Sequence, residues 1–117
     1  MYVTVLVMPV PEENIDAYKD WAELSASIFK DYGCTEVVDS WEDFVPIGKN
    51  TDFFKAVKAE PGEKIAFSWQ IWPSKEALFA AEEKMHEDGV LDAHGEPPFD
   101  NQRLITGCFD PVVTMGR

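Results

Sequence analysis

The stretch YVTVLVMPV at residues 2–10 decides the fold, because it is apolar on both sides of an extended chain. Successive side chains of a strand point to opposite faces of the sheet. Val3 and Val5 therefore point one way, whereas Leu6 and Met8 point the other way. A strand with two apolar faces is normally covered on both of them. We therefore expect this first strand to lie inside a sheet that has protein on each side.

Hydrophobic periodicity predicts the elements that follow this strand. Apolar residues three and four positions apart indicate helices, whereas runs rich in β-branched and aromatic residues indicate strands. Gly33 is placed to end the first helix, Ser74 is placed to cap the second, and the turn sequence at residues 60–63 predicts a hairpin. The predicted elements are a helix at 12–32, strands at 34–45, 52–59 and 64–72, a helix at about 75–87, an irregular loop at 88–102 and a last strand from 104 to about 113.

The order βαβββαβ is typical of a single α+β domain of ferredoxin-like type, here spanning residues 1–117. In this fold two helices cover one face of an antiparallel sheet and leave the other face open. Trp41, Trp69 and Trp72 lie on predicted strands, and they cannot all point at the helices. An open face with several large apolar side chains exceeds the patch that monomers tolerate. We therefore expect a homodimer in which a second copy stacks sheet to sheet.

Composition argues against several classes of partner. The chain has 22 Asp and Glu against 10 Lys and Arg, a formal net charge of −12, and a field of that sign repels nucleic-acid phosphates. No apolar run reaches the length of a membrane span, and the first residues lack the features of a signal peptide. We expect neither a nucleic-acid nor a membrane partner. Cys34 and Cys108 are too few for a disulfide framework, so both are expected to be reduced, buried thiols in a cytoplasmic protein.

Two short patterns resemble cofactor or metal motifs. The sequence GKNT at residues 48–51 is similar to the end of a phosphate-binding loop, but the upstream glycine is absent and a strand is predicted to follow, which favours a tight turn. His86 has Glu82 four residues before it and His94 eight residues after it, a spacing that fits metal ligands. An acidic chain also places a glutamate beside a histidine by chance. The sequence therefore predicts neither a metal nor a cofactor.

Polar and aromatic side chains on the predicted strands form the main candidate site. Pockets for small molecules combine apolar walls with a few fixed polar groups. The same side chains would equally suit the core or a dimer interface, and this structural role is favoured. Weak catalytic candidates are Asp52 and His86, either of which would be able to move a proton. The candidates for a ligand pocket or a dimer interface are Trp41, Phe67, Ser68, Trp69, Gln70 and Arg103.

Five segments also carry a family resemblance: VPIGKNTDF at 45–53, AVKAE at 56–60, FSW at 67–69, PSKE at 73–76 and PFD at 98–100. In this order they resemble the YbaA-like family of small uncharacterised bacterial proteins, a domain-of-unknown-function family, over essentially the whole chain. The resemblance implies a dimeric α/β-barrel, in which two ferredoxin-like sheets pack into one barrel. It implies no activity and no catalytic residues.

Two functional hypotheses of different classes follow. The first is a small-molecule enzyme such as a cofactor-independent oxygenase or isomerase, for which fold analogy is the sole support. The second is a non-catalytic dimer that binds a small ligand, or one whose acidic surface attracts a basic protein partner. Whether the protein is an enzyme stays open from sequence. A pocket between the sheet and the helices is the feature that would support either small-molecule hypothesis.

Overall fold

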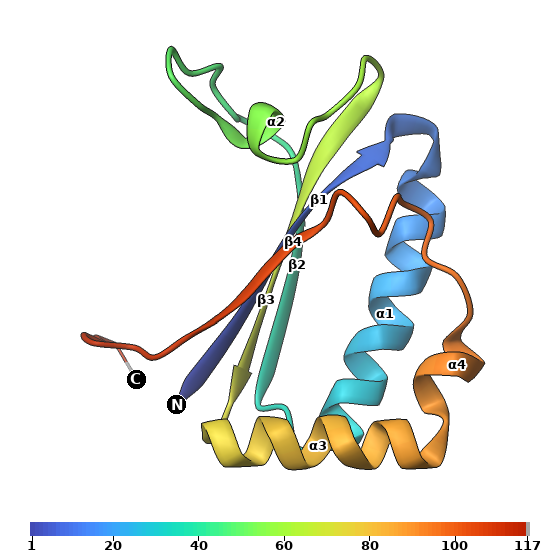
Figure 1. Ribbon diagram of the computed structural model, residues 1–117, viewed down its shortest axis with the longest axis vertical. Coiled ribbons are helices and arrows are strands. Elements are labelled where there is room, and N and C mark those ends of the chain that lie inside the picture. The colour runs from blue at the N-terminus through green and yellow to red at the C-terminus, as the bar shows by residue number, and fades with distance from the viewer. Residues whose placement is uncertain (117) are drawn as a thin grey trace.

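The computed structural model describes residues 1–116 and contains a four-stranded sheet with its longer helices on one side (Figure 1). The strands are β1 (Tyr2–Pro11), β2 (Glu36–Trp41), β3 (Glu63–Trp72) and β4 (Ile105–Phe109). The helices are the 3-10 turn η1 (Glu12–Asn14), α1 (Ile15–Asp31), α2 (Phe53–Ala56), α3 (Lys75–Asp88) and α4 (Val90–His94).

The strand order in the sheet is β2-β3-β1-β4, and each neighbouring pair is antiparallel. β1 therefore lies between β3 and β4, in the interior position that its two apolar faces predict. The register pairs Met8 with Ala66 on the helix-facing side, and Val5 with Trp69 on the opposite side. This strand order with its two helical connections is ferredoxin-like, so the predicted α+β fold class is confirmed.

The predicted strand at 52–59 is wrong, because this segment contains the one-turn helix α2. The side chain of Asp52 caps the helix, accepting a hydrogen bond from the backbone N–H of Lys55 at 2.7 Å. Such a cap offers the backbone an alternative to an extended conformation. Phe53 and the buried Val57 are also four positions apart, so this short run fits a helical period as well as a strand period. The turn at 60–63 consequently leads into β3 and does not close a hairpin.

The helix ends follow their sequence signals more closely. Gly33 lies just beyond α1 with a φ of 105°, a left-handed value that favours glycine. The hydroxyl of Ser74 accepts a hydrogen bond from the backbone N–H of Ala77 at 3.0 Å and caps α3. Both predicted end signals are confirmed. Other details differ: α1 begins at Ile15 after a 3-10 turn, β2 and β4 are shorter than predicted, and the predicted loop at 88–102 contains α4.

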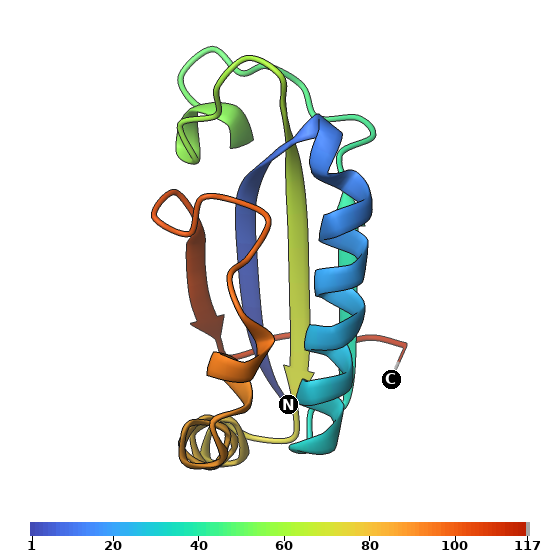
Figure 2. The same cartoon turned by 90° about the vertical axis from the view of Figure 1, so that its right-hand side faces the viewer.

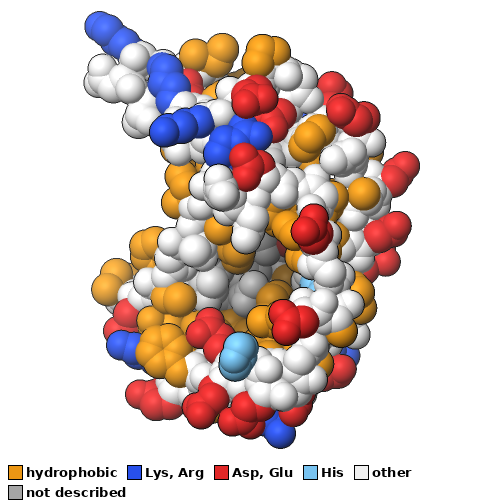
Figure 3. Space-filling model, turned by 45° about the vertical axis from the view of Figure 1, so that its right-hand side comes forward, with side chains coloured by type: hydrophobic (Ala, Val, Ile, Leu, Met, Phe, Trp, Pro, Cys, Tyr) orange, Lys and Arg blue, Asp and Glu red, His pale blue; other side chains and the backbone are white. Residues whose placement is uncertain are grey.

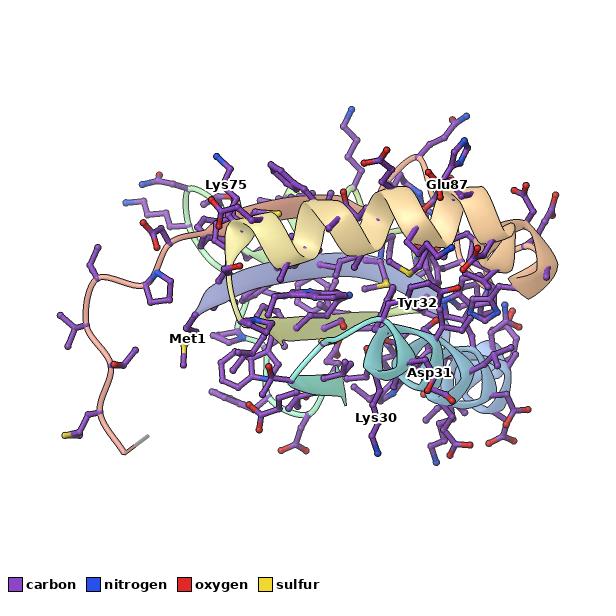
Figure 4. All side chains as sticks on the ribbon, turned by 90° about the horizontal axis from the view of Figure 1, so that it is seen from below. Met1, Lys30, Asp31, Tyr32, Lys75 and Glu87 are labelled. Atoms are coloured by element: carbon purple, nitrogen blue, oxygen red, sulfur yellow. The ribbon has the colours of Figure 1, made fainter. Side chains whose placement is uncertain are left out.

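The two long helices take different directions relative to the sheet. α1 runs along the strands over β2 and beside β3, whereas α3 crosses one end of the sheet (Figures 1 and 2). Figure 4 looks onto α3, with Lys75 and Glu87 toward its two ends and Tyr32 between it and α1. The hydroxyl of Tyr32 donates a hydrogen bond to Oδ2 of Asp88 at 2.6 Å and joins the two helices there. Because α3 lies at the end of the sheet, neither long helix covers the middle of the sheet beside α1.

The core on the helix-facing side has two parts. One lies under α1, where Tyr18 and Ala22 pack on Met8 and Val10 of β1. The other lies under α3 and centres on Trp72, which is fully buried.

The two cysteines differ in their surroundings. Cys34 is buried beside Trp72, as predicted, and burial raises the pKa of its thiol. Cys108 is exposed, so the prediction of a second buried thiol is wrong. It lies on β4, an edge strand that pairs on one side with β1 and whose helix-facing side is not covered by α1.

The sheet face opposite the helices is apolar and largely open. Alternating residues of β1 and β3 point to this face, as the period of two predicts. The edge strands contribute further large side chains, of which Phe109 is 58% exposed. The apolar residues of this open face are Val3, Val5, Val7, Pro9, Val38, Ile65, Phe67, Trp69, Ile71, Ile105 and Phe109. Of these, Pro9, Ile65 and Ile71 are already buried within the chain.

Candidate functional site: a cavity between the sheet and the helices

A cavity of about 300 Å³ lies between the helix-facing side of the sheet, α1, α4 and the segment 95–104. The space-filling view shows a hollow on this side of the molecule, with hydrophobic side chains along it and acidic side chains around it (Figure 3). The volume lies at the lower end of the range for small-molecule sites, about 300–1,000 Å³. The larger apolar side chains in its walls are Leu6, Met8, Trp21, Phe29, Leu91, Phe99 and Leu104.

The cavity exists because an irregular segment, and not a second parallel helix, covers the sheet beside α1. In Figure 2 the segment 95–104 passes in front of β1 and β4, while α1 lies over β2. Nδ2 of Asn14 donates a hydrogen bond to the carbonyl of Pro98 at 3.1 Å and ties the segment to the start of α1. Phe99 packs edge-on against Trp21, with 6.3 Å between ring centroids. These contacts hold the segment against α1 and leave space above the sheet.

Asp39 of β2 brings a carboxylate to the cavity wall. The hydroxyl of Tyr18 donates to its Oδ1 at 3.4 Å, and the hydroxyl of Ser68 on β3 also hydrogen-bonds to the carboxylate. Asp39 is exposed as a residue, but the protein around its carboxylate desolvates the charge in part and raises its pKa above the ordinary value, an effect that the two hydrogen bonds oppose. Burial and the nearby carboxylate likewise raise the pKa of Tyr18. The group is therefore an acceptor in a partly dehydrated place.

His94, the last residue of α4, forms another part of the wall. Its ring stacks on Trp21 at 3.5 Å between centroids and 9° between planes, and its Nε2 is 2.7 Å from the hydroxyl of Ser25. Nδ1 is buried and has no hydrogen-bond partner within residues 1–116. A buried polar atom without a partner costs free energy, and such atoms are frequent at binding sites.

The structure separates the predicted pocket residues into three places. Ser68 and Gln70 line the cavity, and Oε1 of Gln70 accepts a hydrogen bond from the indole of Trp72 at 3.2 Å. Phe67 and Trp69 point to the opposite, open face. They therefore cannot share a site with Ser68 and Gln70 within one chain.

The remaining predicted residues lie outside the cavity. Trp41 lies against Tyr18 beside a neighbouring smaller hollow. Arg103 forms a two-pronged ion pair with Glu63, with both N–O distances at 2.7 Å. Asp52 caps α2 and also accepts a hydrogen bond from the backbone of Gly48, and these backbone hydrogen bonds lower its pKa. His86 is exposed on α3.

Of the two motif-like patterns, GKNT at 48–51 has a structural role, and the spacing around His86 does not form a three-residue cluster in the described part of the chain. Gly48 closes a tight turn, since a Cβ placed there would lie 1.9 Å from the carbonyl oxygen of Thr51. No group of three His, Cys, Asp or Glu side chains that would be able to hold a metal ion occurs in residues 1–116. None of the described helices has the length and apolar character that crossing a bilayer requires.

Sequence reasoning missed the most informative cavity residues, which are Asp39, His94, Tyr18 and Trp21. The apolar spacing of α1 placed Tyr18 and Trp21 on its inner face, but it could not show that part of that face borders a space. Asp39 carried a usable signal, because it is a charged residue on the side of β2 that faces the helices. His94 was noted only for its spacing from His86, and nothing placed it at a cavity, since its short helix follows a left-handed Gly89 within a stretch without periodicity.

Comparisons with known proteins agree with this fold. The model of a family described as "Protein of unknown function (DUF1428)" matches residues 1–101. The uncharacterised protein YbaA of Escherichia coli K12 is 43% identical over 113 residues, covering 96% of this chain and 97% of YbaA, and the Shigella flexneri YbaA matches equally. A solved structure of a dimeric ferredoxin-like protein from an uncultured marine organism superposes with a TM-score of 0.65 over all of both chains, at 11% identity. The chain therefore belongs to the DUF1428 family of proteins of unknown function.

Proposed function

We propose that this protein binds a small organic molecule in the cavity between the sheet and the helices. The observation that carries the proposal is the combination in one space of apolar walls with the partly dehydrated carboxylate of Asp39 and the ring of His94. Mostly apolar lining with a few fixed polar groups is the usual composition of a ligand site. Binding is the step that an enzyme and a sequestering protein would share.

Filling the cavity tests this proposal. Ala22 is buried on α1 and lines the cavity, so the larger side chain in Ala22→Leu takes up space that a ligand needs. The probe is 2-naphthol, measured by calorimetry and by protein NMR. We expect saturable binding to the native protein with shifts of the Trp21 indole N–H signal, and at least tenfold weaker binding to Ala22→Leu, since about 1.4 kcal/mol is tenfold.

The matched control is Ala17→Leu, which adds the same volume at an exposed position of the same helix. It should bind the probe like the native protein. Far-UV circular dichroism and the NMR spectrum show whether each variant is folded, and Ala22→Ser, which keeps the cavity nearly unchanged, should retain binding. Equal binding by folded Ala22→Leu and native protein would contradict the proposal.

We also propose that two copies of the chain associate through the open face of the sheet. Trp69 and Phe109 are more than a third exposed on that face, with valine and isoleucine around them. Apolar patches of this kind mark interfaces, and a two-fold dimer lets one patch cover its own copy. The ferredoxin-like protein that shares the fold is described as dimeric, which supports a dimer of this chain.

Two segments extend on the same side as the open face and would add to such an interface. The segment 42–62 with α2, and the segment 110–116, both project away from α1 (Figure 1). The first carries Phe44 and Ile47, both more than four-fifths exposed, and the second carries Val112 and Met115, which are almost fully exposed. A groove of about 400 Å³ lies between Phe44, Phe53 and Phe67, where the first segment meets the sheet. A second copy seated on the open face would bury these side chains.

A further inference from the structure

We infer that the ligand of the cavity is an uncharged or cationic molecule of about two fused rings that donates a hydrogen bond to Asp39. This inference rests on the proposed function, because it concerns the occupant of the same cavity. It follows from the size of the space, from the charges around it and from the unused hydrogen-bonding capacity of one carboxylate.

Size sets the scale of the ligand. A dry apolar cavity of about 150 Å³ in another protein holds one benzene ring. The present cavity, at about 300 Å³, has room for roughly twice that. Tyr18 and Trp21 of α1 pack against Phe99 of the segment 95–104, at 6.4 and 6.3 Å between ring centroids, so the three rings form one aromatic wall that suits a flat ligand.

Charge selects against anions. Within the described chain, Asp39 is the one carboxylate of the cavity wall, and no lysine or arginine lines it. Lys19 borders the smaller hollow on the other side of Asp39 and does not line this cavity. The protein as a whole carries a net charge of −12. A carboxylate or phosphate ligand would therefore meet a like charge at close range with no lysine or arginine to pair with.

Hydrogen bonding selects for a donor. An ionised carboxylate has about four lone-pair sites, and Tyr18 and Ser68 supply two hydrogen bonds to Asp39. The capacity that remains is for further donors. A ligand hydroxyl or amine that reaches Asp39 would form a charge-assisted hydrogen bond in a place where water competes less, and such bonds are among the stronger ones.

Three probes of similar shape test the inference. 2-Naphthol donates a hydrogen bond, 2-methoxynaphthalene has the donor capped, and 2-naphthoate is an anion at neutral pH. We expect the native protein to bind 2-naphthol at least about tenfold more tightly than 2-methoxynaphthalene, and 2-naphthoate more weakly than either, as judged by calorimetry at pH 7.5.

The variant Asp39→Asn separates this inference from the proposed function. It keeps an acceptor for Tyr18 but removes the charge, so the preference for 2-naphthol should shrink and 2-naphthoate should bind more tightly than to the native protein. Binding of 2-methoxynaphthalene should change little, which shows that the variant is folded with its cavity intact. Equal affinity of the native protein for all three probes would overturn the donor preference and leave the cavity as a binding site. Binding of none of them would overturn both.

Discussion

At the scale of single residues, Asp39 is the carboxylate of the cavity wall in residues 1–116, and its environment differs from water although the residue is exposed. Desolvation raises its pKa above the ordinary value of 3.8, and the hydrogen bonds from Ser68 and Tyr18 only partly compensate. A carboxyl whose pKa is higher in the folded state favours folding at low pH, and that contribution is lost as the pH rises through the folded pKa. Ionised Asp39 therefore costs stability at neutral pH, as binding groups frequently do.

Asp39→Asn should accordingly raise the free energy of unfolding at pH 7, by roughly 0.5–1 kcal/mol, a value kept small because the carboxylate still meets solvent. The gain should disappear near pH 3, where the native carboxyl is also protonated. Urea unfolding at both pH values measures the difference between variant and native protein. Glu83→Gln, at an exposed position of α3, is the control and should change stability little at either pH. A loss of stability at pH 7 in Asp39→Asn would show that its charge helps to hold the fold.

Residue identity predicted local roles better than it predicted the site. Ser74 and Gly33 act where their chemistry indicates, because a cap and a left-handed residue depend on a few neighbouring backbone atoms. Asp52 was a catalytic candidate and is a helix cap for the same reason. Asp39 and His94 line the same cavity only because distant segments of the chain pack together, and no local sequence pattern predicts that packing.

At the scale of elements, the segment 95–104 depends on Arg103 for its attachment to the sheet. The guanidinium bonds both carboxylate oxygens of Glu63 at the start of β3, and it also donates to the carbonyl of Lys58 at 3.0 Å and to Asp100. The side chains of Arg103 and Glu63 are 18% and 8% exposed, so solvent screens this pair less than an ordinary surface pair. Because the segment 95–104 forms one wall of the cavity, the same contacts hold that wall in place.

Glu63→Gln should lower the free energy of unfolding by about 1–3 kcal/mol at pH 7, since it breaks a charge-assisted pair. The hydrogen bonds from Arg103 lower the pKa of Glu63 below its ordinary value of 4.5. Its contribution is therefore present above that ordinary value and is lost as the pH falls through the lower, folded pKa. The difference between variant and native protein in urea unfolding should vanish at sufficiently low pH. The exposed neighbour Glu60→Gln is the control, and a difference that persists unchanged into acid would contradict this role.

Element prediction succeeded where periodicity was long and failed where it was short. The two-sided β1 and the 17-residue α1 each provide many positions that agree on one period. The segment 52–59 offers too few positions to separate a helix from a strand, and one capping hydrogen bond decides it. The direction of α3 across the end of the sheet, which makes room for the cavity, arises from packing around Trp72 and is invisible in the periodicity of the helix itself.

At the scale of the whole molecule, the two apolar faces of β1 predict how the sheet is covered, which no short motif does. α1 and α3 cover one side of the sheet, while the opposite side keeps Trp69 and Phe109 in contact with solvent. An aromatic side chain at the centre of an interface commonly contributes 2 kcal/mol or more to association. If a glutamate replaced such an aromatic side chain, it would face apolar groups, or the same glutamate of the second copy, across a two-fold interface. Its charge would then be buried without a partner.

Light scattering at micromolar concentration should therefore give the native protein a mass of twice 13.2 kDa. The variants Trp69→Glu and Phe109→Glu should each have a mass of 13.2 kDa. A loss of about 3 kcal/mol corresponds to a dissociation constant more than a hundredfold higher, enough to dissociate a dimer whose dissociation constant is about 0.1 µM under these conditions. Leu24→Glu replaces a similarly exposed apolar residue on α1, on the other side of the sheet, and should leave the mass unchanged. Because the cavity lies on the helix side, both open-face variants should still bind 2-naphthol if they are folded. A native mass of 13.2 kDa, or an unchanged mass in both folded variants, would show that the two copies do not meet through this face.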